Sequence, residues 1–403
     1  MSLKKIASDF KARYIDERRL PEAARQQLQR DRAGLPEHDA GPLAVAEAGI
    51  EWLKRSQDKS ACQDGGSARD FSLLRGWASS YPETSGYIVP TLIDFAARTN
   101  DQPLADRAQR MLDWLVSIQF PEGGFQGGKV DASERVPVTF NTGQILLGLA
   151  AGVQRFGEAY RRPMVLAGSW LRDSLDPDGC WRKHATPFAS PGEKAYETHV
   201  SWGLFEAARI EPGLGFAEAG LKQVRWAIGK QMDNGWFASN SLSSPAEPHT
   251  HTIGYVLRGV IEAYRFAGEA DLLAAAALTA DALLEVIEDD GRLPGKLDRN
   301  WRPTVDWVCL TGNVQIAACW LLLFGITGKA AYLDAARRAN RYVRRTVYLS
   351  GNPDVVGGVR GSFPVDGDYG RFEYLNWAAK FCVDSQLLEA SADVPPRGPG
   401  DER

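Results

Sequence analysis

Apolar residues recur at helical spacing along most of the chain, in segments that alternate between two kinds. Segments of the first kind have an apolar face and a charged face, whereas segments of the second kind are apolar around most of their circumference. A helix that is apolar on most sides must be buried on most sides. We therefore expect an outer ring of amphipathic helices around an inner ring of apolar ones. The expected outer helices span 103–118, 162–175, 215–231 and 271–287, and the inner helices span 141–156, 198–210, 252–267 and 311–326.

A glycine turn between the two helices of each pair repeats at a constant distance. The turns are centred on Gly123, Gly179, Gly235 and Gly291, and each of these glycines lies 56 residues after the one before it. An acidic or amide residue precedes every turn, and a bulky residue follows soon after it. A fixed period of this length is typical of an array of equal helical units.

The two ends of the chain fit the same plan. Further helices are expected at 43–54 and 87–98 around Gly65, and at 330–347 and 376–388 around Gly357. These helices bring the number of pairs to six. We therefore predict an all-α fold in the form of a closed (α/α)6 toroid, which six pairs favour over an open superhelix. Outside the toroid domain, 41–391, we expect an N-terminal helical arm over residues 1–40 and a disordered tail over 392–403.

The composition excludes several classes of protein. With 44% hydrophobic and 24% charged residues, the chain of 403 residues is typical of a globular protein. The net charge of -4 and the scattered lysines and arginines argue against nucleic acid as a partner. The apolar run 316–326 is too short to span a bilayer, so we interpret it as a buried helix and expect no integral membrane segment.

The five cysteines are widely separated, and none forms a C-x-x-C pair. Cys62, Cys180, Cys309, Cys319 and Cys382 therefore indicate neither a disulfide framework nor a structural zinc site. We expect no metal and no other cofactor. The N-terminal segment has two lysines but lacks the apolar stretch of a secretory signal, which favours a cytoplasmic protein. The oligomeric state does not follow from the sequence.

Two of the glycine turns share the pattern Q-x-x-x-G-x-aromatic, from Gln119 to Phe125 and from Gln231 to Phe237. This pattern resembles the repeat of terpene cyclases and protein prenyltransferase subunits, which implies an α/α toroid. The acidic D-x-D-D motif of squalene-type cyclases is absent from the sequence. Asp306 and Cys309 are the nearest match to a prenyltransferase zinc site, but no histidine follows them. The resemblance therefore supports the fold and not isoprenoid chemistry.

Three other segments resemble bacterial proteins that are encoded with surface-polysaccharide biosynthesis genes. They are Tyr81-Pro-Glu-Thr-Ser-Gly-Tyr87, Cys309-Leu-Thr-Gly-Asn313 and Gly361-Ser-Phe-Pro364. This resemblance covers most of the chain and implies a role in exopolysaccharide biosynthesis, with an oligosaccharide or polysaccharide as substrate. The six-hairpin toroid is also the scaffold of uronate lyases, sugar epimerases and several glycosidases.

Four of the five histidines lie around the start of two neighbouring inner helices. His199, His249 and His251 stand at the helix mouths, and His184 lies in the loop before the first of them. A histidine is the usual general acid or base near neutral pH, and Glu197 is placed to orient one. The alternative is that these side chains cap helices and brace loops. His249 and His251 have no third partner that would complete a metal site.

Carboxylates at the same mouths supply a second kind of chemistry. The candidates are Glu83, Glu197, Asp306, Asp366, Asp368 and Glu373. Two of them facing each other across the toroid would permit glycoside hydrolysis. For each carboxylate alone, capping and compensation of the helix dipole is the competing interpretation.

The remaining candidates would hold a sugar. Trp181, Trp236 and Trp307 offer flat faces for a sugar ring, although the first two could instead be structural wedges between units. The other expected substrate-binding side chains are Asn141, Arg258, His249, Asn313 and Glu373. Arg258 in particular could pair with a carboxylate or phosphate.

Three hypotheses follow. The first is a C5-epimerase or lyase acting on a uronate-type sugar, with His199 or His251 as base, Tyr255 as acid, and Asn141 or Arg258 neutralising the carboxylate. The second is a glycosidase that uses Glu83, Glu197 or Glu373. The third is a non-catalytic glycan-binding or scaffold protein. The histidine cluster favours the first, because hydrolysis needs no imidazole.

Overall fold

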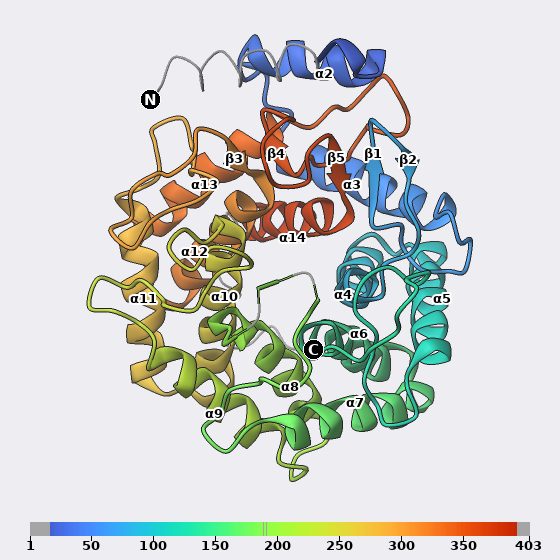
Figure 1. Cartoon of the computed structure of the whole chain (residues 1–403), viewed down its shortest axis with the longest axis vertical. Helices are drawn as coiled ribbons and strands as arrows, with labels where there is room; N and C mark the ends of the chain where they lie inside the picture. The colour runs from blue at the N-terminus through green and yellow to red at the C-terminus, as the bar shows by residue number, and fades with distance from the viewer. Residues whose placement is uncertain (1–16, 188, 191, 393–403) are drawn as a thin grey trace.

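The computed structural model describes residues 17–187, 189–190 and 192–392, and these fold into a closed ring of paired helices (Figure 1). The predicted (α/α)6 toroid is confirmed. The outer helices are α3 (Pro42–Asp58), α5 (Gln102–Ile118), α7 (Arg161–Ser174), α9 (Phe216–Ile228), α11 (Ala270–Leu284) and α13 (Ala330–Arg344). The inner helices are α4 (Pro82–Thr99), α6 (Thr139–Phe156), α8 (Thr198–Ile210), α10 (Thr250–Ala267), α12 (Leu310–Thr327) and α14 (Asn376–Ala392).

Helix α4 begins at Pro82, five residues before the predicted start at 87. Proline is favoured in the first turn of a helix because its fixed φ suits the helix and its missing N–H has no partner there. Tyr81, which precedes the helix, has an extended backbone. The earlier start brings Glu83 into the first helical turn.

Burial distinguishes the two rings as the apolar pattern predicts. Helix α12 is buried on almost every side, while α13 buries one face and leaves residues such as Arg341 exposed. The segment Leu310–Thr327 is long and apolar enough to cross a membrane by composition, but 72% of it is buried inside the protein. This burial supports its interpretation as a core helix.

The repeated glycines link each unit to the next one. Gly123, Gly179, Gly235, Gly291 and Gly357 all have positive φ angles, which favour glycine. A Cβ on any of them would collide with backbone atoms of a neighbouring outer helix. The neighbour of Gly357 is Ala48 on α3, the first outer helix. The last unit therefore packs on the first one by the same contact that joins the others, and this closes the ring.

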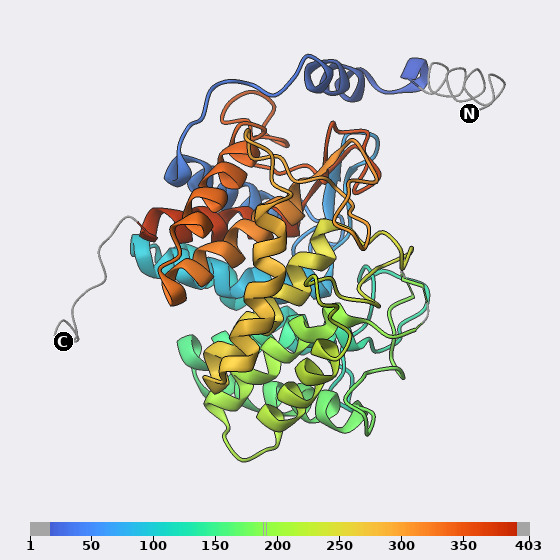
Figure 2. The same ribbon diagram turned by 90° about the vertical axis from the view of Figure 1, so that its left-hand side faces the viewer.

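Short strands that the sequence did not predict reinforce this closure. Strand β1 (Asp70–Ser72) pairs with β2 (Gly76–Trp77) on one side and with β5 (Glu373–Leu375) on the other, both antiparallel. A second sheet joins β3 (Val308–Cys309) to β4 (Ser362–Phe363). The loops that carry the strands gather at one end of the ring, opposite the short connections between units (Figure 2).

Helix α2 (Glu22–Arg32) crosses the outside of the ring at the loop between β4 and β5. The buried side chain of Asp31 pairs with Arg360 and accepts a 2.8 Å hydrogen bond from the backbone N–H of Val365. Ala24 and Leu28 pack against Val365 and Phe372. The first part of the expected arm, 1–16, and the expected tail from 393 onward lie outside the described residues, so the domain boundaries remain a prediction.

Candidate active site

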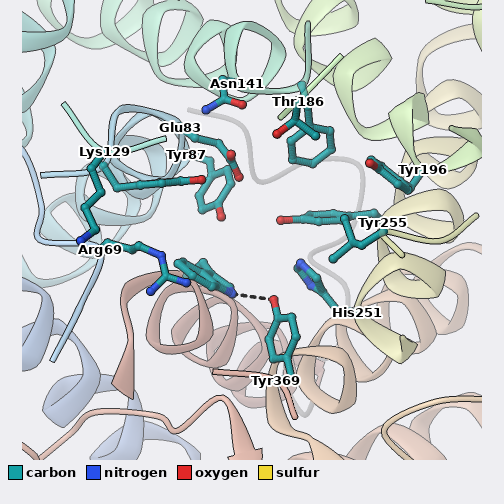
Figure 3. A pocket seen from close by; sticks show the side chains of 14 residues that line it. Arg69, Glu83, Tyr87, Lys129, Asn141, Thr186, Tyr196, His251, Tyr255 and Tyr369 are labelled. Carbon is teal, nitrogen blue, oxygen red and sulfur yellow. Dashed lines mark hydrogen bonds between the residues drawn. The ribbon is translucent and has the colours of Figure 1, made fainter. Parts of the chain in front are cut away.

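A cavity of about 400 Å³ opens at the loop-bearing end of the ring (Figure 3). Residues at the beginning of inner helices α4, α6, α10 and α14 form its walls, together with residues from the long loops. Half of the lining side chains are aromatic. The lining residues are Arg69, Tyr81, Glu83, Tyr87, Lys129, Phe140, Asn141, Thr186, Tyr196, Leu242, His251, Tyr255, Tyr369 and Trp377.

Glu83 lies in the first turn of α4 and faces the cavity. Burial raises the pKa of its carboxyl to about 8, against the opposing effects of the Arg69 charge and a hydrogen bond from Tyr81. Burial also raises the pKa of the Tyr81 hydroxyl, so it remains a donor to Glu83. Glu83 therefore holds a proton at neutral pH, which it could give to a ligand in the cavity.

His251 lies in the first turn of α10, on the opposite side of the cavity from Glu83 (Figure 3). Its Nδ1 is 2.8 Å from Oε1 of Gln315 on α12. An amide oxygen only accepts hydrogen bonds, so Nδ1 carries the proton and Nε2 keeps its lone pair. Burial lowers the pKa of His251 to about 3, and the imidazole is therefore neutral at physiological pH. The side chain is thus an acceptor with a fixed tautomer.

Tyr255 stands one helical turn after His251, between two imidazoles. Its ring centroid lies 4.3 Å from that of His251 and 4.5 Å from that of His199. The Tyr255 hydroxyl points toward the centre of the cavity and toward Tyr87 (Figure 3). Burial raises its pKa well above the ordinary value, which keeps the hydroxyl protonated.

Arg69 supplies a positive charge on the wall near Glu83. Its Nη1 donates to Asp70 at 2.6 Å and to Glu373 at 3.0 Å, and its guanidinium lies 5.1 Å from the Trp377 ring. Both carboxylates keep the pKa of Arg69 raised, although burial opposes them. Lys129 is exposed at the mouth of the same cavity. The two cations give this end of the cavity a positive character that suits an anionic group.

Four predicted site residues line the cavity, and they are Glu83, Asn141, His251 and Tyr255. Asn141 is buried, and its Nδ2 has no hydrogen-bond partner within the part of the chain that the structure describes. A buried amide donor without a partner is costly, so this group is available to a ligand.

Two other predicted acid–base residues lie behind the cavity wall. His199 is buried behind Tyr255, with its Nδ1 2.7 Å from Oε1 of Gln144. Glu197 is also buried, and one of its oxygens has no partner among the described residues. Burial raises the pKa of Glu197 to about 8, with Lys194 acting in the opposite direction. Neither side chain belongs to the cavity lining.

The predicted sugar-binding aromatics are mostly packed inside the protein. Trp181 donates a 2.9 Å hydrogen bond to the carbonyl of Leu171, and Trp236 is in edge contact with Trp301. Trp307 is buried and lies 6.0 Å, ring to ring, from His249. Burial lowers the pKa of His249 to about 4. These four predicted side chains support the walls of the toroid and do not reach the cavity.

The last three predicted residues have partners of their own. Asn313 braces the turn at Gly291, because its Oδ1 accepts from the N–H of Leu293 and its Nδ2 donates to the carbonyl of Gly291. Glu373 is held by Arg69 and Arg75 just outside the cavity. Arg258 lines a different cavity, at the other end of the ring.

Several lining residues were not expected from the sequence. Arg69, Lys129, Phe140, Thr186 and Leu242 lie in loops or at a helix start, and they belong to four different units. Arg69 precedes strand β1, which meets β5 only when the ring closes. No local pattern places it beside Trp377. The described residues contain no group of three histidine, cysteine or acidic side chains suited to hold a metal ion.

Comparisons with known proteins support the fold. No protein-family model matches the sequence, and neither does any curated protein. Similar solved structures include an unsaturated glucuronyl hydrolase specific for heparin, at 14% identity and a TM-score of 0.67, covering 86% of this chain and 96% of that one. Cellobiose 2-epimerase from Bacillus thermoamylovorans has 11% identity, a TM-score of 0.66 and coverages of 86% and 99%. A D-mannose isomerase has 12% identity, a TM-score of 0.67 and coverages of 87% and 99%.

Proposed function

We propose that the protein is a carbohydrate-active enzyme that transfers protons on a uronate-type sugar, as a C5-epimerase or a lyase. The observation that carries this proposal is the pairing of His251, an imidazole with Nε2 as acceptor, with Glu83, a protonated carboxyl, on opposite sides of one aromatic cavity. An acceptor and a donor on opposite faces of a bound ring are what proton removal and return require.

The first step breaks the C5–H bond of the sugar. The proton passes to Nε2 of His251, and the electron pair spreads onto the adjacent carboxylate as an enediolate. Arg69 and Lys129 supply positive charge for that carboxylate, and the free amide donor of Asn141 offers a further hydrogen bond.

The second step distinguishes the two reactions. In an epimerase, Glu83 gives a proton to C5 from the opposite face, and the two side chains recover their original protonation by exchange with water. In a lyase, the enediolate electrons form the C4–C5 double bond and expel the C4 oxygen, which takes a proton from Glu83 or Tyr255. Both side chains are protonated at neutral pH, because burial raises the pKa of each.

The aromatic lining suits a sugar as the ligand. Tyr196, Tyr369 and Trp377 surround the cavity, and Trp377 donates a 2.8 Å hydrogen bond to the Tyr369 hydroxyl. Aromatic faces of this kind stack on the apolar face of a pyranose ring. The structural neighbours support the same substrate class, since their names describe a glucuronyl hydrolase, a cellobiose epimerase and a mannose isomerase.

Glycoside hydrolysis is the second candidate, and the cavity favours it less. Hydrolysis of this kind uses two carboxyl groups that flank the glycosidic bond. Within the described lining of the cavity, Glu83 is the one acidic side chain. Glu197 and Glu373, the other carboxyls that the sequence offered, lie outside it. A glycan-binding role without catalysis remains the third candidate.

The biological setting follows from the sequence resemblance to proteins of surface-polysaccharide biosynthesis. We place the reaction in exopolysaccharide assembly in the cytoplasm, with an oligosaccharide or polysaccharide precursor as substrate. The cavity of about 400 Å³ is of a size that accommodates one or two sugar rings.

Incubation with uronate-containing and neutral glycans in D2O, followed by NMR, tests the proposal. Deuterium at C5 identifies an epimerase, and a C4–C5 double bond identifies a lyase. New reducing ends without either signal would instead identify a hydrolase. If no substrate changes, calorimetric titration with the same glycans separates a binding protein from one that does not recognise sugars. The variant E83Q, which should keep only a small residual rate, serves as the control.

A further inference from the structure

A second cavity, of about 300 Å³, lies at the other end of the inner helices. Its lining residues come later along the same helices than those of the first cavity. On α4, for example, Glu83 lines the first cavity, whereas Thr91 and Asp94 line the second. The same order holds on α10, where His251 and Tyr255 precede Arg258. The two cavities therefore open at opposite ends of the ring.

Aromatic side chains separate the two cavities. Tyr87 lines both of them, and its ring centroid lies 5.3 Å from that of Phe381. Phe381 in turn lies 6.0 Å from Tyr255. A ligand in the second cavity is thus separate from the proposed sugar site but touches the same wall.

Arg258 is fixed on one side and unpaired on the other. Its Nε donates to Glu262 at 2.7 Å, and its guanidinium lies 4.1 Å from the Trp202 ring. Its two terminal nitrogens donate to no other residue within the described part of the chain. The side chain keeps 16% of its surface exposed. The two terminal nitrogens, held on a rigid plane, are therefore available to a ligand in the cavity that Arg258 lines.

The charges around Arg258 do not cancel. Glu262 is shared with Arg265, which donates to both of its oxygens at 2.9 Å. One carboxylate thus faces two guanidinium groups, and one positive charge is left over. The three carboxylates that line the cavity already have cationic partners. These pairs are Lys380–Asp384, Arg98–Asp94 and Arg209–Glu206.

We propose that this second cavity binds a small molecule that carries a carboxylate or a phosphate, through the two terminal nitrogens of Arg258. A planar guanidinium makes paired hydrogen bonds to an oxyanion of either kind. Contact with Trp202 and the bond to Glu262 hold that plane before the ligand arrives, which lowers the cost of binding. The volume restricts the ligand to a small metabolite or an inorganic anion. The proposal does not depend on the chemistry of the first cavity.

Calorimetric titration of the full chain with inorganic phosphate, and separately with acetate, at constant ionic strength tests this site. Saturable binding of at least one anion is expected, weakened at least tenfold in R258Q. R69Q removes an arginine from the first cavity and so reports any anion binding there. R162Q, at an exposed position outside both cavities, is the matched control and should bind as tightly as the wild-type protein. Binding of phosphate alone would assign a phosphoryl ligand, and binding of both anions would assign any small oxyanion.

A second variant tests the site independently, in case R258Q does not fold. R265Q removes the excess charge from a half-exposed position without touching the cavity, and it should weaken binding several-fold. Circular dichroism checks that both variants are folded. Absence of saturable binding to the wild-type protein would overturn the proposal. Equal binding by the wild-type protein and both variants, or loss of binding in R69Q alone, would also overturn it.

Discussion

Gln315 on α12 holds the imidazole of His251 on α10 through a 2.8 Å contact between Oε1 and Nδ1. The amide thereby selects the tautomer in which Nε2 is free to accept a proton. Both side chains are buried, and they come from neighbouring inner helices. The proposed base thus depends on a residue that does not line the cavity.

Replacing Gln315 with leucine should lower kcat roughly 10- to 100-fold, as is usual for a residue that orients a reactive imidazole. KM should change little, because Gln315 does not reach the substrate. Q315E should keep the tautomer and most of the activity. The 15N NMR shifts of the His251 ring provide a measurement independent of turnover. Unchanged nitrogen shifts in Q315L would contradict this role.

The E83Q variant should lose roughly 10²- to 10⁴-fold in kcat, since an amide cannot donate the required proton. The wild-type rate should fall as pH rises above about 8, where Glu83 becomes ionised. This alkaline loss should be absent from the residual activity of E83Q. E122Q, at an exposed loop position, is the control and should behave as the wild type. A wild-type rate that stays flat to pH 10 would exclude Glu83 as the acid.

Buried Glu197 should make the protein less stable as the pH rises. Its pKa is raised to about 8 in the folded state, so between pH 4.5 and 8 the folded chain holds a proton that the unfolded chain has released. A tenfold change in an acid dissociation constant corresponds to roughly 1.4 kcal/mol, so the loss of stability amounts to a few kcal/mol. E197Q should unfold at a higher urea concentration than the wild type at pH 8.5, and the advantage should be much smaller at pH 4.5. An equal advantage at both values would contradict this origin.

Removing the Arg69 charge in R69Q should raise KM roughly tenfold or more for an anionic sugar. The reason is the loss of the main cation beside Glu83. R69K should recover part of the affinity, because it keeps the charge but loses the paired geometry. Initial rates on the uronate substrate and on a neutral analogue give the comparison. An equal effect on both sugars would indicate a structural role instead.

The seam of the ring is the contact at which the last unit packs on the first. A substitution at this seam should lower the stability of the protein more than an equivalent substitution at a glycine that has no atoms nearby. Gly357 and Gly351 both have positive φ, but only Gly357 lies against another backbone, that of Ala48. Alanine at either position costs about 1 kcal/mol for its backbone conformation. G357A should lose clearly more stability than G351A in thermal unfolding, because its Cβ also pushes α3 and the last unit apart. Similar melting temperatures for the two variants would count against a tight seam.

The helix pairs were predictable because each unit repeats the same local signals. Gly235, for example, combines a turn after the end of α9, a positive φ and a contact with the next outer helix, and the sequence repeats that combination at a fixed interval. Most helices fall within a few residues of their expected ranges. The strands escaped prediction because β1 and β5 pair residues about 300 positions apart.

The candidate site was also only partly predictable, because contacts between residues far apart in the sequence decide which side chains reach the cavity. Glu83, Asn141 and His251 lie near the beginning of inner helices, and the repeat places such positions at a common end of the ring. The repeat does not determine which of these positions face the axis. The repeat also does not predict that Tyr255 covers His199, or that Arg258 lines the second cavity.

The seam between the first and last units has a consequence for how activity arises during synthesis. Arg69 and Glu83 come from the first unit, whereas Tyr369 and Trp377 come from the last. A nascent chain emerges N-terminus first, and its domains tend to fold in that order. The early helix pairs could stack while the rest is still being made, yet the cavity would lack a wall until the final inner helix arrives. Catalytic activity would thus require the complete ring. A truncated chain would be inactive even if most of it were folded.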